Sequence, residues 1–168
     1  RWINLGLSTE PQTIREVMQD LEVNLDLNEH QFPTNPKILI AGCGTGKHAL
    51  SVASSFQNSS VLAIDLSLSS LSYAIRKTKE LSVANIDYMQ GDILKLNTLN
   101  RQFDIIESAG VLHHMEDPLA GWKVLVDLLK PQGLMRIGLY SEIARQHIVE
   151  IREFIVKKRY KNSPEDIR

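Results

Sequence analysis

Short apolar runs alternate along this chain with longer stretches in which apolar residues recur every three or four positions. The short runs predict strands over residues 37–41, 61–65, 86–90, 103–108 and 134–140. The longer stretches predict helices over residues 46–56, 68–81, 117–129 and 142–160. Apolar strands that alternate with helices form parallel sheets covered on both faces. We therefore predict an α/β fold, a Rossmann-like doubly wound parallel sheet of about five strands with helices on both faces.

A further helix is predicted ahead of the first strand. The segment from Ser8 to Pro11 is typical of a helix start, because proline is favoured in the first turn. Residues 28–36 are rich in proline and polar side chains, which predicts a connector. We divide the chain into an N-terminal helix with its connector, residues 1–36, and one domain, residues 37–168. The apolar face of the helix is predicted to consist of Ile14, Val17, Met18 and Leu21.

Three alternate glycines, Gly42, Gly44 and Gly46, join the first predicted strand to its helix. Glycine allows a sharp turn and leaves no side chain between the backbone and a ligand. The helix that follows directs its free N–H groups and the positive end of its dipole to the same place. The next strand ends in Asp65. Strand, glycine turn, helix, strand and carboxylate form the layout of a nucleotide or nucleoside site, so we predict a ligand that carries a ribose.

The spacing of the glycines distinguishes between such ligands. The dinucleotide fingerprint G-x-G-x-x-G leaves room for a pyrophosphate, whereas this chain has G-x-G-x-G and no arginine beside Asp65. The P-loop spacing is not met either, and His48 stands in place of its hydroxyl residue. An NAD-dependent oxidoreductase therefore fits the acid after the second strand but not the glycine turn.

Several segments, in order between residues 37 and 140, resemble the motifs of class I S-adenosylmethionine-dependent methyltransferases of the small-molecule type. The resemblance implies S-adenosyl-L-methionine as the cofactor and methyl transfer to an undetermined small-molecule acceptor. A non-catalytic cofactor-binding module of a larger repeat protein is the alternative. The segments are Ile38–Gly46, Ala63–Ser67, Gln90–Ile93, Phe103–Ser108, Gly110–Pro118 and Leu129–Leu134.

The same resemblance implies a set of binding residues at the ends of the strands. Asp65 is expected to accept hydrogen bonds from the ribose hydroxyls, unless it caps the next helix instead. Asp92 is expected to accept from the adenine amine with Ile93 covering the ring, unless it is an ordinary turn aspartate. The full cofactor-binding set is Ala41, Gly42, Cys43, Gly44, Gly46, Asp65, Leu66, Gly91, Asp92, Ile93, Ser108 and Ala109.

Three further residues qualify this picture. Ile40 stands where most members of the family carry an acid, so contacts to the methionine part are expected from backbone groups of Gly42–Gly46 and from the Ser108–Gly110 turn instead. His113 and His114 are the candidates for a general base on the acceptor. Neighbouring side chains on a regular element point different ways, so we expect one of the two at most to enter the site. No zinc-like ligand spacing accompanies them, and we predict no metal.

Composition narrows the range of partners. The chain has 168 residues, a formal net charge of −1 and 23% charged residues, which favours a single domain without a nucleic-acid partner. No apolar run approaches the roughly 20 residues of a membrane span, so we expect no membrane partner. The start of the sequence lacks both Met and a signal-peptide pattern, which favours a trimmed cytoplasmic protein. The single cysteine, Cys43, excludes a disulfide framework and is interpreted as a small residue in a tight loop, with a helix-activated thiol as the alternative.

The resemblance also concerns the edge of the sheet. Members of the family usually finish with two further strands, one of them antiparallel, which are missing from the predicted elements. We expect an open edge that is covered either by self-association as a homodimer or by contact with another part of a parent chain. Residues 1–2 and 139–145 resemble bacterial methyltransferase domains joined to tetratricopeptide repeats.

Overall fold

The computed structural model describes residues 7–8, 10–21, 27, 30–141, 143–161 and 163–164 of the chain. The chain divides into two compact units, Arg1–Gly138 and Leu139–Arg168, and each is treated by itself. The first unit holds a sheet with its covering helices. The predicted domain boundary between residues 36 and 37 stays a prediction.

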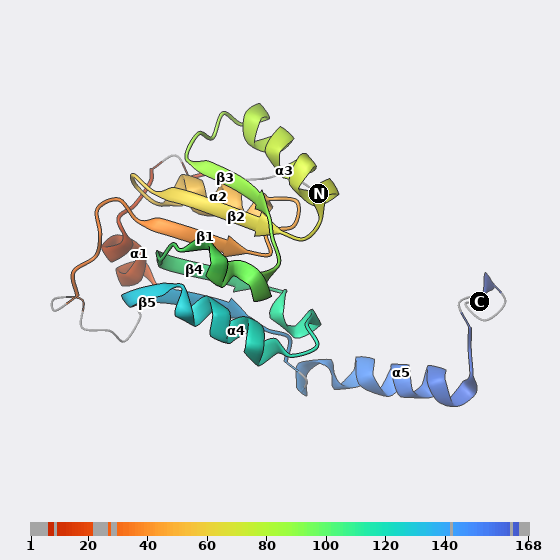
Figure 1. Cartoon of the computed structure of the whole chain (residues 1–168). Helices are drawn as coiled ribbons and strands as arrows, with labels where there is room; N and C mark the ends of the chain where they lie inside the picture. Colours follow the sequence, from red (N-terminus) through yellow and green to blue (C-terminus); the bar gives the residue numbers. More distant parts are fainter. Residues whose placement is uncertain are drawn as a thin grey trace. The chain divides into compact units, whose positions relative to one another are not determined.

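Five parallel strands form the sheet in the order β3-β2-β1-β4-β5 (Figure 1). The predicted doubly wound parallel sheet is therefore confirmed. The chain passes from β1 to one side of the sheet and later from β3 back to the other side, so the loops at β1 and β4 diverge. Such a reversal opens a crevice at the carboxyl ends of the strands. The strand bounds are β1 Lys37–Ala41, β2 Ser60–Asp65, β3 Ile86–Gln90, β4 Phe103–Ala109 and β5 Leu129–Gly138.

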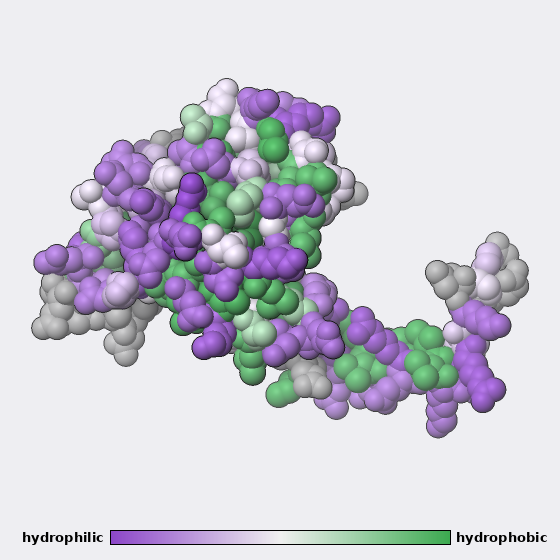
Figure 2. All heavy atoms as spheres, in the orientation of Figure 1, coloured by the Kyte–Doolittle hydropathy of each residue, from purple (hydrophilic) through white to green (hydrophobic). Residues whose placement is uncertain are grey.

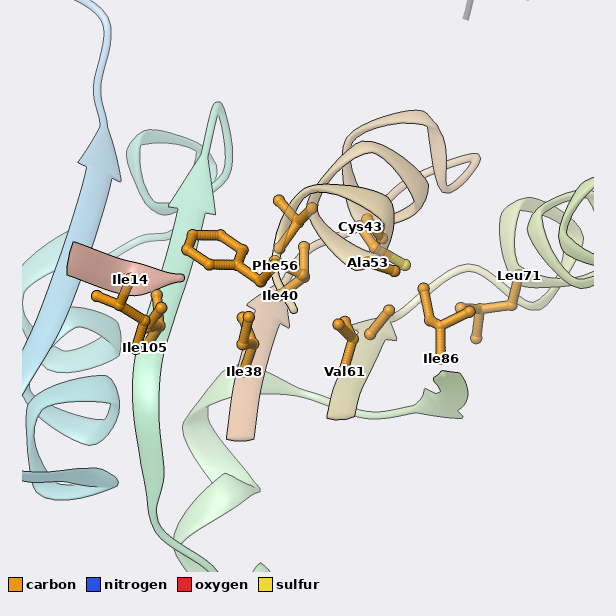
Figure 3. Packing of buried hydrophobic residues seen from close by; sticks show 13 residues of the cluster. Ile14, Ile38, Ile40, Cys43, Ala53, Phe56, Val61, Leu71, Ile86 and Ile105 are labelled. Carbon is orange, nitrogen blue, oxygen red and sulfur yellow. The ribbon is translucent and has the colours of Figure 1, made fainter. Parts of the chain in front are cut away.

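Helices cover both faces of the sheet and create two apolar clusters. On one face, Ile38 and Ile40 of β1 pack with Phe56 and with Ile105 of β4 (Figure 3). On the other face, Leu39 belongs to a second cluster. Since β1 is buried on both sides, its sequence is a continuous apolar run instead of an alternating one. The first face carries α1 (Ile14–Asp20), α2 (Lys47–Ser55) and α3 (Leu68–Glu80), and the second carries the 3₁₀ helices η1 (Ile93–Leu99) and η2 (Leu112–His114) and the helix α4 (Pro118–Asp127).

The start of α1 corrects the sequence prediction. The helix begins after the N-cap residue Thr13 and not near Ser8 to Pro11. The Glu16 N–H donates to the Thr13 hydroxyl over 3.3 Å, and the Thr13 N–H donates to the Glu16 carboxylate over 2.7 Å. The Thr13 N–H bond and, after it, a bond of 2.8 Å that the Thr13 hydroxyl donates to the same carboxylate lower the pKa of Glu16. This reciprocal capping box satisfies two backbone donors and outweighs the proline signal. Leu21 follows the helix and is 63% exposed, so the predicted apolar face ends before it.

Strand β5 also begins earlier than predicted. Phe103 of β4 pairs with Leu129, whereas Ile105 pairs with Leu134, so the residues between them on β5 bulge out of register. Gln132 in this bulge has φ +63°. Pro131 lacks a backbone N–H, which the edge position of β5 tolerates. The predicted loop into the fifth strand is therefore a bulge inside the strand.

The second unit contains the 3₁₀ turn η3 (Ile143–Arg145) and the helix α5 (Gln146–Lys158). In Figure 2 hydrophobic and hydrophilic residues both show along α5. Among the described residues, no helix combines the length and the apolar character that crossing a membrane requires. The exposed apolar residues of α5 are Val149, Ile151, Phe154, Ile155 and Val156.

Candidate cofactor site

A cavity of about 330 Å³, here called the carboxyl-end cavity, opens where β1, β2, β3 and β4 end. Its wall combines bare glycine backbone, two carboxylates and apolar side chains. Eight of the predicted cofactor-binding residues line it, together with four others. The lining residues are Gly42, Gly44, Asp65, Leu66, Gly91, Asp92, Ile93, Ala109, Gly110, Val111, His114 and Met115.

The glycine turn between β1 and α2 is tied to the end of β2. The N–H groups of Gly42 and Cys43 both donate to the Ile64 carbonyl, over 2.9 and 2.8 Å. Gly42, Gly44 and Gly46 have φ values of +82°, +53° and +86°, in the region that favours glycine. The alternate glycines are therefore required by the backbone path. Gly46 is the N-cap of α2 and offers no side chain to the first turn of that helix.

Close packing gives a second reason for glycine at Gly42. A Cβ atom there would lie 2.3 Å from a methyl group of Val111. At Gly44, by contrast, no described residue other than its two chain neighbours lies within 4 Å of the Cβ position. Gly44 therefore presents open backbone to the carboxyl-end cavity.

Asp65 ends β2, and two backbone donors hold its carboxylate in the cavity wall. The Gly44 N–H donates to Oδ2 over 2.7 Å, and the Ser67 N–H donates to Oδ1 over 2.9 Å. The N-cap of α3 is Ser67, whose hydroxyl accepts from the Ser70 N–H. The alternative that Asp65 caps this helix is therefore wrong. Each carboxylate oxygen still has a lone pair for another donor.

Asp92 combines both roles considered for it from the sequence. Its Oδ1 accepts from the Leu94 N–H over 3.0 Å, so Asp92 caps η1 as a turn aspartate does. The same residue lines the carboxyl-end cavity, and its Oδ2 makes no hydrogen bond to the described part of the chain. Two apolar neighbours complete this end of the cavity. Leu66 is 67% exposed, whereas Ile93 is buried.

Four predicted residues, Ala41, Cys43, Gly46 and Ser108, do not line the cavity. Ala41 and Ser108 are buried, and the Ser108 hydroxyl donates to the Ala41 carbonyl over 3.0 Å. At Gly46, a Cβ atom would lie 2.6 Å from that of Ala74. The Cys43 side chain belongs to the apolar cluster under α2 (Figure 3). These residues shape the turn and the strand ends behind the cavity wall.

The Cys43 thiol is protected by its surroundings. Burial, with a contribution from the Asp65 carboxylate, raises the pKa of Cys43 to about 12. The thiolate is the reactive form of cysteine, so this thiol is inert near neutral pH. The interpretation of Cys43 as a small residue in a tight loop is confirmed, and helix activation is wrong.

The loop after β4 supplies cavity residues that the predicted binding set left out. Gly110, Val111 and Met115 all line the cavity. These residues could have been predicted from their position just after an apolar strand, because Asp65 was predicted from its position at the end of such a strand. Of the two candidate bases, His114 lines the cavity, whereas the ring nitrogens of His113 are buried away from solvent. The expectation that one histidine at most enters the site agrees with this placement.

An acid that the sequence analysis did not single out lies beside Ile40. Ile40 is 2% exposed, and its register partner on β4 is Glu107. His48 Nε2 donates to Glu107 Oε2 over 2.7 Å, and Arg136 Nη1 donates to the same oxygen over 3.2 Å. All three residues line a groove of about 820 Å³ next to α1, here called the α1 groove. Glu107 was not predicted as a site residue, because it lies inside an apolar strand pattern. Among the described residues, no group of three or more His, Cys, Asp or Glu side chains is arranged to hold a metal.

Comparison with known proteins identifies the family. The family model described as "Methyltransferase domain" matches residues 38–133, more than half of the chain. An uncharacterized protein of Synechococcus sp. is 37% identical over 121 residues, which cover 71% of this chain and 29% of that protein. Phosphoethanolamine N-methyltransferase 1 of Arabidopsis thaliana is 28% identical over 124 residues, covering 74% of this chain and 25% of the enzyme.

Solved structures agree with the sequence comparison. PKMT2 from Rickettsia typhi, in complex with AdoHcy, is 25% identical with a TM-score of 0.65, and the match covers 73% of this chain and 24% of that one. The chain thus spans between about a quarter and a third of the length of these relatives. The matched family model, together with the parallel sheet and the cavity at its carboxyl ends, shows that the chain belongs to the methyltransferase-domain family, as a class I S-adenosylmethionine-dependent member.

Proposed function

We propose that the protein to which this chain belongs transfers a methyl group from S-adenosylmethionine to a small-molecule acceptor. The observation that carries the proposal is the meeting of three features in one cavity. The glycine turn, the Asp65 carboxylate and the Asp92 carboxylate come from the ends of three neighbouring strands and line the same wall. Family membership supports the same conclusion.

The residues around the cavity fit an adenosyl group. Asp65, held by Gly44 and Ser67, retains lone pairs that suit the two ribose hydroxyls. The Oδ2 atom of Asp92 suits the adenine amine, and the apolar side chains of Leu66 and Ile93 suit the ring faces.

The glycine turn and the loop after β4 then bind the amino-acid end of the cofactor. Gly42 and Gly44 present backbone on one side, and Ala109 and Gly110 present backbone on the other. Gly42 and Gly110 both have positive φ, so these walls follow paths that a bulkier residue adopts only with strain.

The bound cofactor supplies a methyl group on a positively charged sulfur, which is already activated for transfer. The chain therefore has to bind and orient the donor and the acceptor, and orientation of this kind contributes about 7–11 kcal/mol to lowering a barrier. His114 lines the cavity and is the residue that we propose to take a proton from the acceptor hydroxyl or amine.

Isothermal titration calorimetry tests the cofactor assignment on the chain as it is. We expect saturable heat with S-adenosylmethionine and with S-adenosylhomocysteine, and none with NADH. Heat with NADH alone, or with none of the three, would overturn the proposal. Transfer of a labelled methyl group by the full-length protein to a metabolite pool would then identify the acceptor.

A further inference from the structure

Glu107 is an unusual residue in this core. The residue is 6% exposed, and no other charged residue among those described is buried to this degree. A buried carboxylate is unfavourable unless cations or hydrogen-bond donors compensate for its lost hydration. The elements that supply these partners are therefore the elements that Glu107 connects.

Its partners come from two different elements. His48 lies in the first turn of α2 and donates from Nε2 to Oε2 over 2.7 Å. Arg136 lies on the edge strand β5, is 69% exposed and donates to the same oxygen over 3.2 Å. A carboxylate oxygen only accepts, so the hydrogen in the shorter bond belongs to the imidazole. The His48 contact thus ties the start of α2 to β4.

This hydrogen bond joins the two elements that form opposite walls of the carboxyl-end cavity. His48 follows Gly46 by two residues, and Glu107 precedes the lining residue Ala109 by two residues. Neither His48 nor Glu107 lines that cavity itself; both face the α1 groove. The glycine turn and the loop after β4 are joined behind the wall by this bond, and the Ser108 hydroxyl adds a bond between β4 and β1.

We infer that the hydrogen bond between His48 and Glu107 positions the glycine turn relative to the loop after β4 and so sets the width of the cavity at its amino-acid end. The inference rests on the proposed function, because it concerns the part of S-adenosylmethionine that lies between these walls. His48 and Glu107 are positioning residues. At the adenosyl end, Asp65 accepts from the Gly44 and Ser67 N–H groups and Asp92 from the Leu94 N–H, and neither carboxylate hydrogen-bonds to His48 or Glu107 in the described part of the chain.

Two related ligands separate this role from a general effect on folding. S-adenosylhomocysteine spans both ends of the site, whereas 5′-methylthioadenosine is the same nucleoside thioether without the amino-acid chain. Titration calorimetry of the complete 168-residue chain measures both affinities. Glu107→Ala and His48→Ala should each raise the Kd of S-adenosylhomocysteine about tenfold, as expected for loss of a charge-assisted hydrogen bond. The Kd of 5′-methylthioadenosine should stay within about twofold.

Conservative and distant substitutions complete the test. Glu107→Gln keeps an oxygen that accepts from His48 and should restore most of the affinity for S-adenosylhomocysteine. Glu80→Ala removes a carboxylate that pairs with Lys77 on the exposed side of α3, and should change neither affinity. The double substitution of His48 and Glu107 should be no worse than either single one, because both remove the same bond.

The measured affinities can overturn the inference in two ways. Equal losses for both ligands, or no loss for S-adenosylhomocysteine in a His48→Ala protein that unfolds cooperatively, would overturn the inference. His48 is 38% exposed, so this variant decides the matter even where Glu107→Ala does not fold. Failure of the unaltered chain to bind either ligand would instead overturn the proposed function, and the inference with it.

Discussion

The backbone N–H of Gly44 donates a hydrogen bond of 2.7 Å to Oδ2 of Asp65, across 21 residues of sequence. This contact joins the glycine turn after β1 to the carboxylate that ends β2. Both residues line the carboxyl-end cavity, so the carboxylate is oriented before any ligand arrives. An acceptor that is already oriented loses less entropy on binding than one that must be ordered.

Removal of the Asp65 carboxylate should therefore weaken cofactor binding more than it weakens the fold. Asp65→Ala removes acceptors for the two ribose hydroxyls, each hydrogen bond contributing about 1.5–3 kcal/mol. We expect the Kd of S-adenosylhomocysteine to rise at least about a hundredfold in calorimetry. Asp65→Asn keeps one acceptor oxygen and should lose less. An unchanged affinity in the alanine variant would remove Asp65 from the site.

Alanine at Gly42 should mainly reduce stability, whereas alanine at Gly44 should mainly reduce cofactor binding. Gly42→Ala places a methyl group against Val111 at a φ of +82°, which should lower the free energy of unfolding by about 2–4 kcal/mol. Gly44→Ala meets no described atom within 4 Å other than those of its chain neighbours, so only its φ of +53° counts, at about 1 kcal/mol. The Gly44 variant should instead lose affinity for S-adenosylhomocysteine, because its methyl group projects from the cavity wall. Denaturant unfolding and calorimetry measure the two effects, and equal stability losses would contradict the geometry.

The buried thiol predicts a pH dependence of stability. The pKa of Cys43 is raised from 9.0 to about 12, so the folded state keeps its proton where the unfolded state has lost it. The stability contribution is complete below pH 9 and is lost as the pH rises toward 12, with a slope of up to about 1.4 kcal/mol per pH unit. Cys43→Ala should make the unfolding free energy flatter over this window than in the unaltered chain. Iodoacetamide at pH 8 should label the thiol in denaturant and spare it in buffer.

The capping box of α1 is open to a simple test. Thr13→Ala removes the hydroxyl that accepts from the Glu16 N–H, and loss of such an N-cap costs about 1 kcal/mol. A fall in the thermal midpoint measured by circular dichroism should follow. Ser8→Ala, at the helix start that the sequence suggested, is the matched control and should leave the midpoint unchanged. A larger effect at Ser8 would restore the earlier start.

The two adjacent histidines should behave differently on substitution. His114 lines the cavity, so His114→Ala should change the affinity for S-adenosylhomocysteine and leave the thermal midpoint nearly unchanged. The ring nitrogens of His113 are buried, so His113→Ala should lower the midpoint and affect binding less. Thermal unfolding and calorimetry on both proteins measure these effects. The reverse pattern would move the candidate base from His114 to His113.

Much of the sheet was predictable because its signals are local. Strand β1 runs over the predicted residues, since a strand buried on both faces needs a continuous apolar run and the glycine turn ends it. The edge strand β3 also runs over the predicted residues, although most of its side chains are only partly buried or exposed. The positions of Asp65 and Asp92 at strand ends were also predictable from chain order. The start of α1 was not, because a reciprocal pair of hydrogen bonds at Thr13 outweighed a proline signal that is only statistical.

The amino-acid sequence by itself determined the class of fold, the order of its elements and the edge of the sheet at which a ligand meets the backbone. Only the tertiary structure decided which side chains face that ligand. Gly44 lines the cavity while its neighbour Cys43 turns into the core, and Glu107 meets His48 across 59 residues. The physical reason is that apolar periodicity depends on near neighbours along the chain. The direction of a side chain in a turn, and the partner of a buried charge, depend on elements that only folding brings together.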